Sequence, residues 1–207
     1  MKNKLLEKFF RTAEVDSETP SAAALANFQM SMDKNPEAFK EIHSVIDEEI
    51  FSLQPERGSE VAKEKAEIEA ADGAQVIHLM RRGIDHLNQE LLIERAMLFE
   101  NEIVPQIVKM LKTSLNDEFI ETAVRVLAKS KKDIAEELIK NYGEMRNPYA
   151  QSLTLALLGF KAGEKDIEWF IEKYDELKRL YPDETYCEGA YYALCEIENR
   201  FYPRKKR

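Results

Sequence analysis

The segment DEFIETAVRVLAK at residues 117–129 decides the fold, because four of its residues, Ile120-Glu121-Thr122-Ala123, belong to a recurring pattern. Three other segments align with these four residues without gaps, namely Ile93-Glu94-Arg95-Ala96, Ala150-Gln151-Ser152-Leu153 and Cys187-Glu188-Gly189-Ala190. In each, an apolar residue is followed by an acid or amide, a variable residue and a small or apolar one. Matching positions are 27, 30 and 37 residues apart. The pattern indicates one structural unit repeated along the chain.

Around these segments the chain is expected to form helices in pairs from residue 74 onward. The predicted first members are 74–86, 102–113, 132–142 and 165–180, and the second members are 89–99, 117–129, 148–160 and 186–200. First members match one another through Ile103, Ile134 and Ile167. No run of alternating β-branched residues with hairpin turns occurs, so we expect an all-α protein. Two helices per unit at such a period are typical of an α-solenoid.

On these residues the chain resembles the HEAT-like family of helical repeats, over about residues 74–200. The resemblance implies an irregular α-α superhelix in which the second helix of each pair lines the concave side. An irregular helical bundle is the alternative architecture. Pro105 leaves two local interpretations open: it lies in the first turn of a helix that starts after Asn101, or it kinks one long helix over 88–113.

Residues 1–72 differ from the repeats and predict an N-terminal helical segment. Its helices are expected at 1–15, 21–32, 36–53 and 59–71, with a turn at 54–58. The third carries Phe39, Ile42, Val45, Ile46, Ile50 and Phe51 at helical spacing. The fourth has only Val61 and Ile68 as large apolar residues and is expected to be a solvated connector. The predicted regions are therefore 1–72, the helical-hairpin region 73–203 and a basic tail 204–207, within one continuous structural unit.

Local signals set the predicted helix ends. Asn35-Pro36 and Asn147-Pro148 each combine a capping residue with Pro at the first helical position. Ser130 with Asp133, and Thr185 with Glu188, have the spacing of capping boxes. Stops are expected at Gly143, at 159–163 and at Tyr181-Pro182.

Charge and composition limit the possible partners. The 207 residues carry a formal net charge of −9, so nucleic acid is disfavoured as a partner. The tail Arg204 to Arg207 is the exception and is interpreted as a solubilising end. No apolar stretch long enough to span a membrane occurs, and the N-terminus is unlike a signal peptide. Cys187 and Cys195 are too far apart on one helix for a disulfide, so a reducing location, the cytoplasm, is expected.

The sequence offers weak candidates for catalysis. His86 with Glu90, and His43 with Asp47, have i, i+4 spacing, but such a pair provides at most two metal ligands. The alternative hypothesis of a bundle that binds a metal or small ligand therefore centres on His78 and His86. Both cysteines are interpreted as inert core residues rather than as nucleophiles. No phosphate loop, dinucleotide fingerprint or nucleophile elbow occurs, so no cofactor is expected and a binding module is favoured over an enzyme.

The acidic and aromatic clusters have structural as well as functional interpretations. The acids at 47–49 and at 64–69 are interpreted as solvated helix faces. Phe170 and Tyr191 are expected in the core, with Phe201 closing the end of the stack. For Trp169, Tyr192 and Tyr202, core and recognition surface are both open.

The function predicted from these features is a protein-binding scaffold or regulatory adaptor that uses an acidic concave helical surface. The residues expected to face outward there are Glu94, Arg95, Glu121, Thr122, Arg125, Gln151, Ser152, Glu188 and Tyr192. A basic or mixed-charge protein would suit this surface as a partner. The HEAT-like resemblance also implies a second alternative, a DNA glycosylase acting on alkylated bases, although the single Trp169 and the acidic balance disfavour it.

Overall fold

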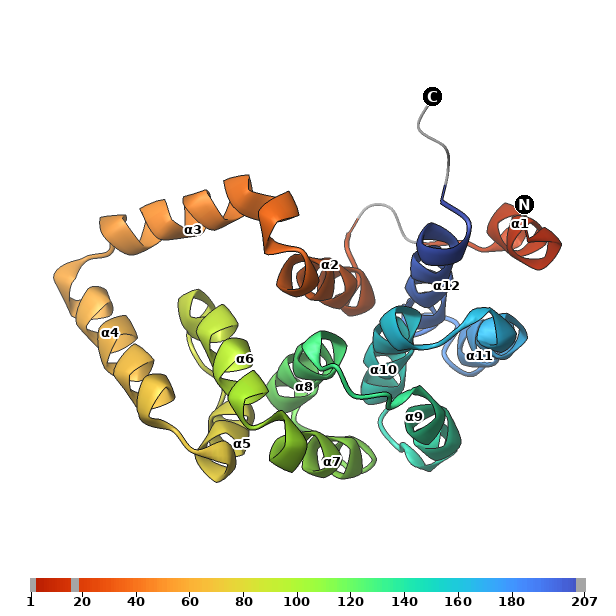
Figure 1. Cartoon of the computed structure of the whole chain (residues 1–207). Helices are drawn as coiled ribbons and strands as arrows, with labels where there is room; N and C mark the ends of the chain where they lie inside the picture. The colour runs from red at the N-terminus through yellow and green to blue at the C-terminus, as the bar shows by residue number, and fades with distance from the viewer. Residues whose placement is uncertain (1–2, 16–18, 204–207) are drawn as a thin grey trace. The chain divides into compact units, whose positions relative to one another are not determined.

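The structure is a computed structural model that describes residues 3–15 and 19–203, so the predicted tail at 204–207 lies outside the described residues. Across those ranges the chain is helical and contains no strand, which confirms the all-α prediction (Figure 1). The α-helices are α1 Lys4–Thr12, α2 Ala22–Lys34, α3 Lys40–Ser52, α4 Pro55–Ala70, α5 Gly73–Arg82, α6 Gln89–Leu98, α7 Glu100–Leu111, α8 Asp117–Lys129, α9 Ala135–Asn141, α10 Pro148–Lys161, α11 Ile167–Leu180 and α12 Glu188–Phe201. Short 3-10 helices occur at η1 Pro36–Phe39, η2 His86–Asn88, η3 Tyr142–Glu144 and η4 Glu164–Asp166. Among these described helices, none is both long and apolar enough to cross a lipid bilayer.

The chain divides into two compact units. The first unit contains residues 1–28 and 133–207, and the second contains residues 29–132. This division passes through α2 and does not follow the boundary between residues 72 and 73 that the sequence suggested.

The first unit is built around the pair α10 and α12 (Figure 1). Two glycines allow these helices to approach closely. A Cβ added to Gly189 on α12 would lie 2.0 Å from the carbonyl oxygen of Ser152 on α10. A Cβ added to Gly159 on α10 would lie 2.6 Å from the Cα of Ala193 on α12. Only glycine fits at either position. Helix α10 ends at Lys161, within the stop predicted at 159–163, and Gly159 lies inside the helix at this contact.

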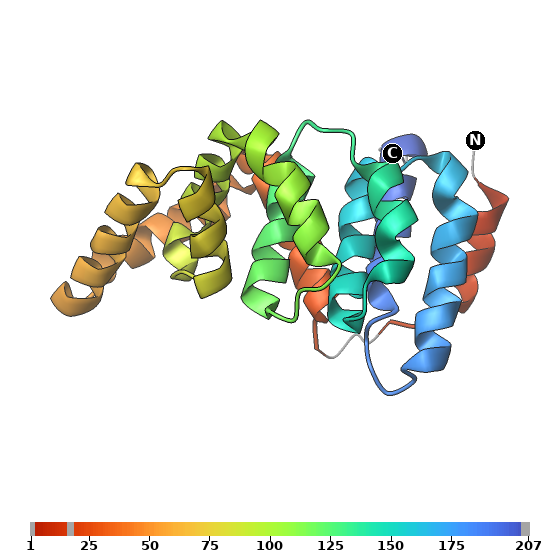
Figure 2. The same ribbon diagram turned by 90° about the horizontal axis from the view of Figure 1, so that it is seen from below.

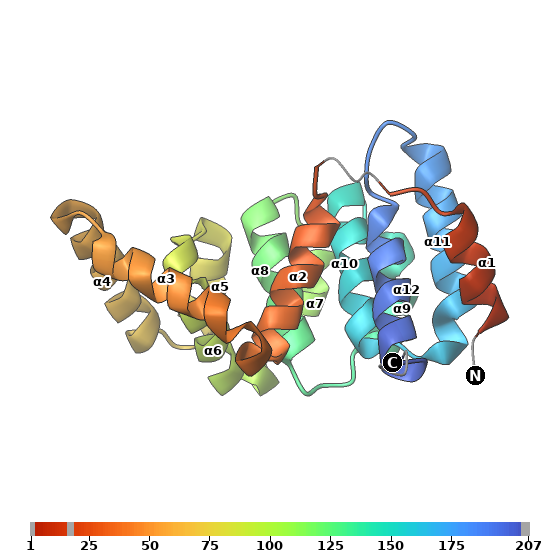
Figure 3. The ribbon, with the colours of Figure 1, turned by 90° about the horizontal axis from the view of Figure 1, so that it is seen from above.

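Helix α11 packs on α12, and α1 packs on both of them (Figure 2 and Figure 3). The ring of Phe9 on α1 lies 5.0 Å from the ring of Tyr174 and 6.2 Å from that of Tyr191, measured between centroids. The backbone N–H of Glu14 donates to the hydroxyl of Tyr174 at 3.0 Å. Phe170 is fully buried, as the sequence predicted, whereas Phe201 is 41% exposed and does not close the stack.

The second unit has its core where α5, α6, α7 and α8 meet. Helix α8 buries Ile120, Ala123 and Leu127 completely, as expected from the pattern that defines the repeat. Pro105 lies in the second turn of α7, and α6 and α7 are separate helices joined at Phe99, so neither interpretation of Pro105 is correct. Pro105 cannot donate to the carbonyl of Asn101, but both residues are exposed, so water can bond to that carbonyl instead.

Several predicted helix ends are wrong for identifiable reasons. Helix α4 begins at Pro55 rather than after a turn at 54–58, because proline fits the first helical position. Neither predicted capping box forms: the Ser130 hydroxyl donates to Glu100 at 2.6 Å, and the N-cap residue of α12 is Cys187. A capping box does form between Asp72 and Gln75 at the start of α5, where the sequence carries the same signal.

The helix contact at Gly189 generates a prediction. Gly189→Ala should destabilise the chain by about 2 kcal/mol or more, because overpacking outweighs the roughly 1 kcal/mol that alanine adds in helix propensity. Thermal unfolding followed by circular dichroism measures the change. Gly143→Ala is the matched control, since a Cβ added at Gly143 meets nothing within 4 Å. Equal melting temperatures for the two variants would contradict the close approach of α10 and α12.

Candidate functional site

Four of the nine residues predicted to face outward are buried, and for them that expectation is wrong. Thr122, Ser152 and Glu188 are each 2% exposed, and Arg125 is 8% exposed. Of the others, Glu94 and Glu121 are exposed, and Arg95, Gln151 and Tyr192 are half-buried.

In the second unit, an ion pair joins the end of α2 to α8. Arg125 donates from Nε to one carboxylate oxygen of Asp33 at 2.8 Å and from Nη2 to the other at 2.9 Å. The side chains of Arg125 and Asp33 are 10% and 3% exposed, so this is a buried, two-pronged ion pair. Arg125 therefore anchors α2 rather than meeting a partner.

In the first unit, Glu188 and Ser152 have structural roles on α12 and α10. The hydroxyl of Ser21, at the start of α2, donates to the carboxylate of Glu188 at 2.5 Å. Ser152 lies beneath the close approach of Gly189. Both residues are polar, which suggested a recognition surface, but in the structure they take part in contacts within the chain.

Two of the half-buried residues also bond within the chain. Arg95 donates from Nε to the carbonyl of Ala71 at 2.8 Å, with its guanidinium 5.2 Å from the centroid of the Phe99 ring. The amide of Gln151 donates to the carbonyl of Met145 at 2.7 Å. Partner binding through Glu94, Glu121 and Tyr192 stays a prediction.

The histidines pair with carboxylates other than those their spacing suggested. Nδ1 of His43 lies 3.3 Å from Glu90, and Nε2 of His86 lies 3.5 Å from Glu49. His78 is exposed on α5. In the part of the chain that is described, no three His, Cys, Asp or Glu residues are grouped so that they could hold a metal ion.

The two thiols are poorly suited to nucleophilic chemistry. Both cysteines are free; Cys187 is buried and Cys195 half-buried. Burial raises the pKa of Cys187, and it raises the pKa of Cys195 to about 12. At neutral pH both side chains are therefore thiols rather than thiolates.

The remaining aromatic candidates are held by their neighbours. The ring of Trp169 is half-buried, with its centroid 5.3 Å from that of Tyr142 and 5.1 Å from that of Phe170. The hydroxyl of Tyr202 donates to the carboxylate of Glu164 and accepts a hydrogen bond from Asn3.

Helix α3 in the second unit differs from the other apolar helices, because it buries none of its residues. Ile42 is 38% exposed, Val45 63%, Ile50 41% and Phe51 92%. The apolar spacing of this segment correctly predicted a helix, but these side chains do not join the core.

Three isoleucines of α3 form a stripe along one side of the helix. Ile42, Ile46 and Ile50 follow one another at intervals of four residues, so they lie on nearly the same face. Phe51 follows Ile50 by about 100° around the helix axis and lies outside the stripe.

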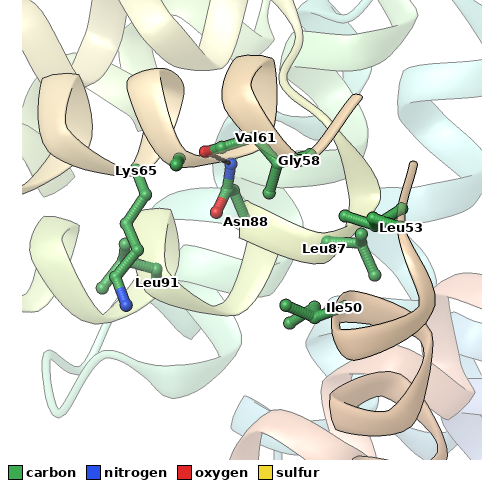
Figure 4. Close-up of a pocket in the computed structure, with 9 residues that line it drawn as sticks. Ile50, Leu53, Gly58, Val61, Lys65, Leu87, Asn88 and Leu91 are labelled. Carbon is green, nitrogen blue, oxygen red and sulfur yellow. Dashed lines mark hydrogen bonds between the residues drawn. The ribbon is translucent and has the colours of Figure 1, made fainter. Parts of the chain in front are cut away.

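The stripe leads to a pocket of about 280 Å³ (Figure 4). Ile50 and Leu53 form one wall, Gly58, Val61, Ala62 and Lys65 of α4 another, and Leu87, Asn88 and Leu91 of η2 and α6 the third. The buried amide of Asn88 donates to the carbonyl of Val61 at 3.0 Å and so joins η2 to α4. We call Ile42, Ile46, Ile50 and this pocket the α3 groove.

Charged side chains border the α3 groove. Arg57 of α4 lies 3.6 Å from Glu49 and 3.7 Å from Asp85, and these pairs join α3, α4 and the segment before η2. Residues 36–71 contain ten carboxylates and four Lys or Arg side chains, a formal net charge of −6. The groove is therefore apolar along its floor and acidic around it.

Comparison with models of protein families, with curated proteins and with solved structures finds no match to this chain.

The buried ion pair generates a prediction. Arg125→Met alone should destabilise the chain by about 3 kcal/mol or more, because Asp33 is left as a buried, uncompensated charge. The double variant Asp33→Leu with Arg125→Met should recover most of this loss, since it removes both charges. Urea unfolding of the two variants and the wild type measures the difference. Unchanged stability of the single variant would show that Arg125 is not an anchor.

Proposed function

We propose that this chain is a protein-binding scaffold or regulatory adaptor. The observation that carries the proposal is the exposure of the apolar stripe on α3, where Ile42 is 38% and Ile50 41% exposed beside a pocket. An exposed apolar surface with a polar border is typical of a protein-interaction site. A helix that leaves such side chains in water gains free energy when a partner covers them.

The proposed binding surface is the α3 groove rather than the row of second helices. Thr122, Arg125, Ser152 and Glu188 are buried and cannot contact a partner without local opening. The acidic character expected of the surface is kept, because the segment that forms α3 and α4 carries much of the excess negative charge.

A HEAT-like arrangement of the helices is part of this proposal. It is supported by the positions of α5 to α12, which occur in pairs where the repeat pattern predicts them. A cytoplasmic location is also proposed, supported by two free cysteines.

Two observations disfavour the alternative functions, a DNA glycosylase and a bundle that binds a metal or small ligand. Trp169, which a glycosylase of this kind would need in an open groove, packs on Tyr142 and Phe170. The residues of the metal hypothesis are separated, since His86 approaches Glu49 while Glu90 approaches His43.

The proposal predicts that binding and folding can be separated. The double variant Ile42→Gln with Ile50→Gln should keep its melting temperature within a few degrees, since substitutions of exposed residues cost roughly 0.5 kcal/mol each. The same variant should lose a partner protein that the wild type retains from an extract of the native host, as quantified by mass spectrometry.

Leu115→Gln is the matched control, because Leu115 is 80% exposed and lies on the loop between α7 and α8. It should retain the partner. Equal recovery of every protein by the groove variant, the control and the wild type would contradict the proposed function.

A further inference from the structure

The α3 groove has features that specify its occupant. We infer that it binds a basic amphipathic helix of a protein partner, with one large apolar side chain of that helix in the pocket beside Ile50. This inference rests on the proposed function and adds the chemical class of the partner.

The shape of the groove suits a helix better than a small molecule. The stripe from Ile42 to Ile50 extends about 12 Å along the axis of α3, at 1.5 Å per residue. A partner helix with apolar residues at intervals of three and four can follow such a stripe. The pocket, at about 280 Å³, is slightly smaller than the usual site for a small molecule, which has a volume of roughly 300–1,000 Å³. It is suited to a single anchoring side chain.

The walls of the pocket explain why an apolar anchor is favoured. Leu53, Leu87 and Leu91 contribute only aliphatic surface, and Val61 is 8% exposed at its base. The amide nitrogen of Asn88 is already committed, because it donates both to the carbonyl of Val61 and, at 2.8 Å, to Glu64. An apolar side chain can therefore enter without leaving this nitrogen unsatisfied.

Charge selects a basic partner. Between Ile46 and Ile50 of the stripe lie three consecutive acids, Asp47, Glu48 and Glu49. Glu49 is bridged to Arg57 and His86, whereas Asp47 and Glu48 are exposed on α3. Glu48 points away from the stripe, because it lies about 200° around the helix axis from Ile46, whereas Asp47 and Glu49 lie on either side of the stripe. Lys or Arg side chains that flank the apolar face of a partner helix would lie close to Asp47 and Glu49.

The same charge disfavours two other occupants. A second copy of this chain would bring two segments of formal charge −6 together. An anionic membrane surface would also repel the segment, and helices that lie on membranes are usually rich in Lys and Arg on their polar face. A basic amphipathic helix is therefore the occupant that complements both the apolar floor and the acidic border of the α3 groove.

A defined peptide tests the inference on the full chain. The probe is a fluorescent Leu/Lys amphipathic helix of about 18 residues, or five turns. Its controls are a Leu/Glu helix with the same apolar pattern and a Leu/Lys peptide of scrambled order. Fluorescence anisotropy should show binding of the Leu/Lys helix alone, weakening as salt is raised.

Neighbouring substitutions locate the site. Ile50→Gln should weaken binding of the Leu/Lys helix about tenfold or more, whereas Phe51→Gln should leave it within about twofold, because only Ile50 lines the pocket. Asp47→Asn should weaken binding and reduce its dependence on salt, whereas Glu48→Gln, on the opposite face of α3, should change neither. Circular dichroism confirms that each variant keeps its helices.

Three results would overturn the inference. Equal affinity for the Leu/Glu helix would remove the preference for a basic partner while leaving the proposed function intact. Loss of binding in Phe51→Gln but not in Ile50→Gln would exclude the groove. The third result is a chain that does not bind the peptide but does self-associate or bind phosphatidylserine vesicles, with Ile50→Gln abolishing that binding. Self-association would assign the groove to a second copy, and vesicle binding would assign it to a membrane.

Discussion

The close approach of α10 and α12 is the constraint on which the first unit depends. Two glycines at the contact allow backbone to meet backbone, and any side chain at Gly189 would collide with the carbonyl of Ser152. The resulting position of α12 brings Glu188 to Ser21 and Tyr191 to the rings of α1. In the second unit the buried pair of Arg125 and Asp33 has a similar role, because it fixes the end of α2 against α8.

These internal contacts determine which surfaces are available for binding. The N-terminal helices use the polar residues of the second helices as anchors, so Arg125 and Glu188 are satisfied within the chain. Helix α3 has no equivalent core contact and leaves its isoleucines half-exposed. The exposed apolar stripe of α3 thus lies beside α4, the segment that sequence analysis had assigned to a solvated connector.

The sequence was sufficient to predict the helices but not the surface. Recurring segments such as Ile120 to Ala123 predicted α6, α8, α10 and α12 to within a few residues, because apolar spacing and caps are local properties. Which face of a helix is covered depends on segments distant in the sequence, as with Asp33 and Arg125, 92 residues apart. No local pattern distinguishes such an anchor from an exposed arginine.

The α3 groove was missed for the opposite reason. Ile42, Ile46 and Ile50 have the spacing of a core-facing helix, and only the structure shows that they remain partly exposed. One signal was present in the sequence: the following helix contributes just Val61 and Ile68 as large apolar residues, too few to cover α3. The cluster Asp47 to Glu49 was interpreted as a solvated face, and Asp47 and Glu48 are indeed exposed. That interpretation did not consider the stripe of isoleucines on the same helix.

Methyl NMR of the chain labelled at isoleucine δ1 positions, during titration with the Leu/Lys helix, tests the central claim most directly. Docking of the peptide on α3 should shift the resonances of Ile42, Ile46 and Ile50 together, while those of the buried residues Ile93, Ile120 and Ile197 stay in place. Shifts confined to other isoleucines, or no shifts at saturating peptide, would show that α3 is not a docking surface for a basic helix.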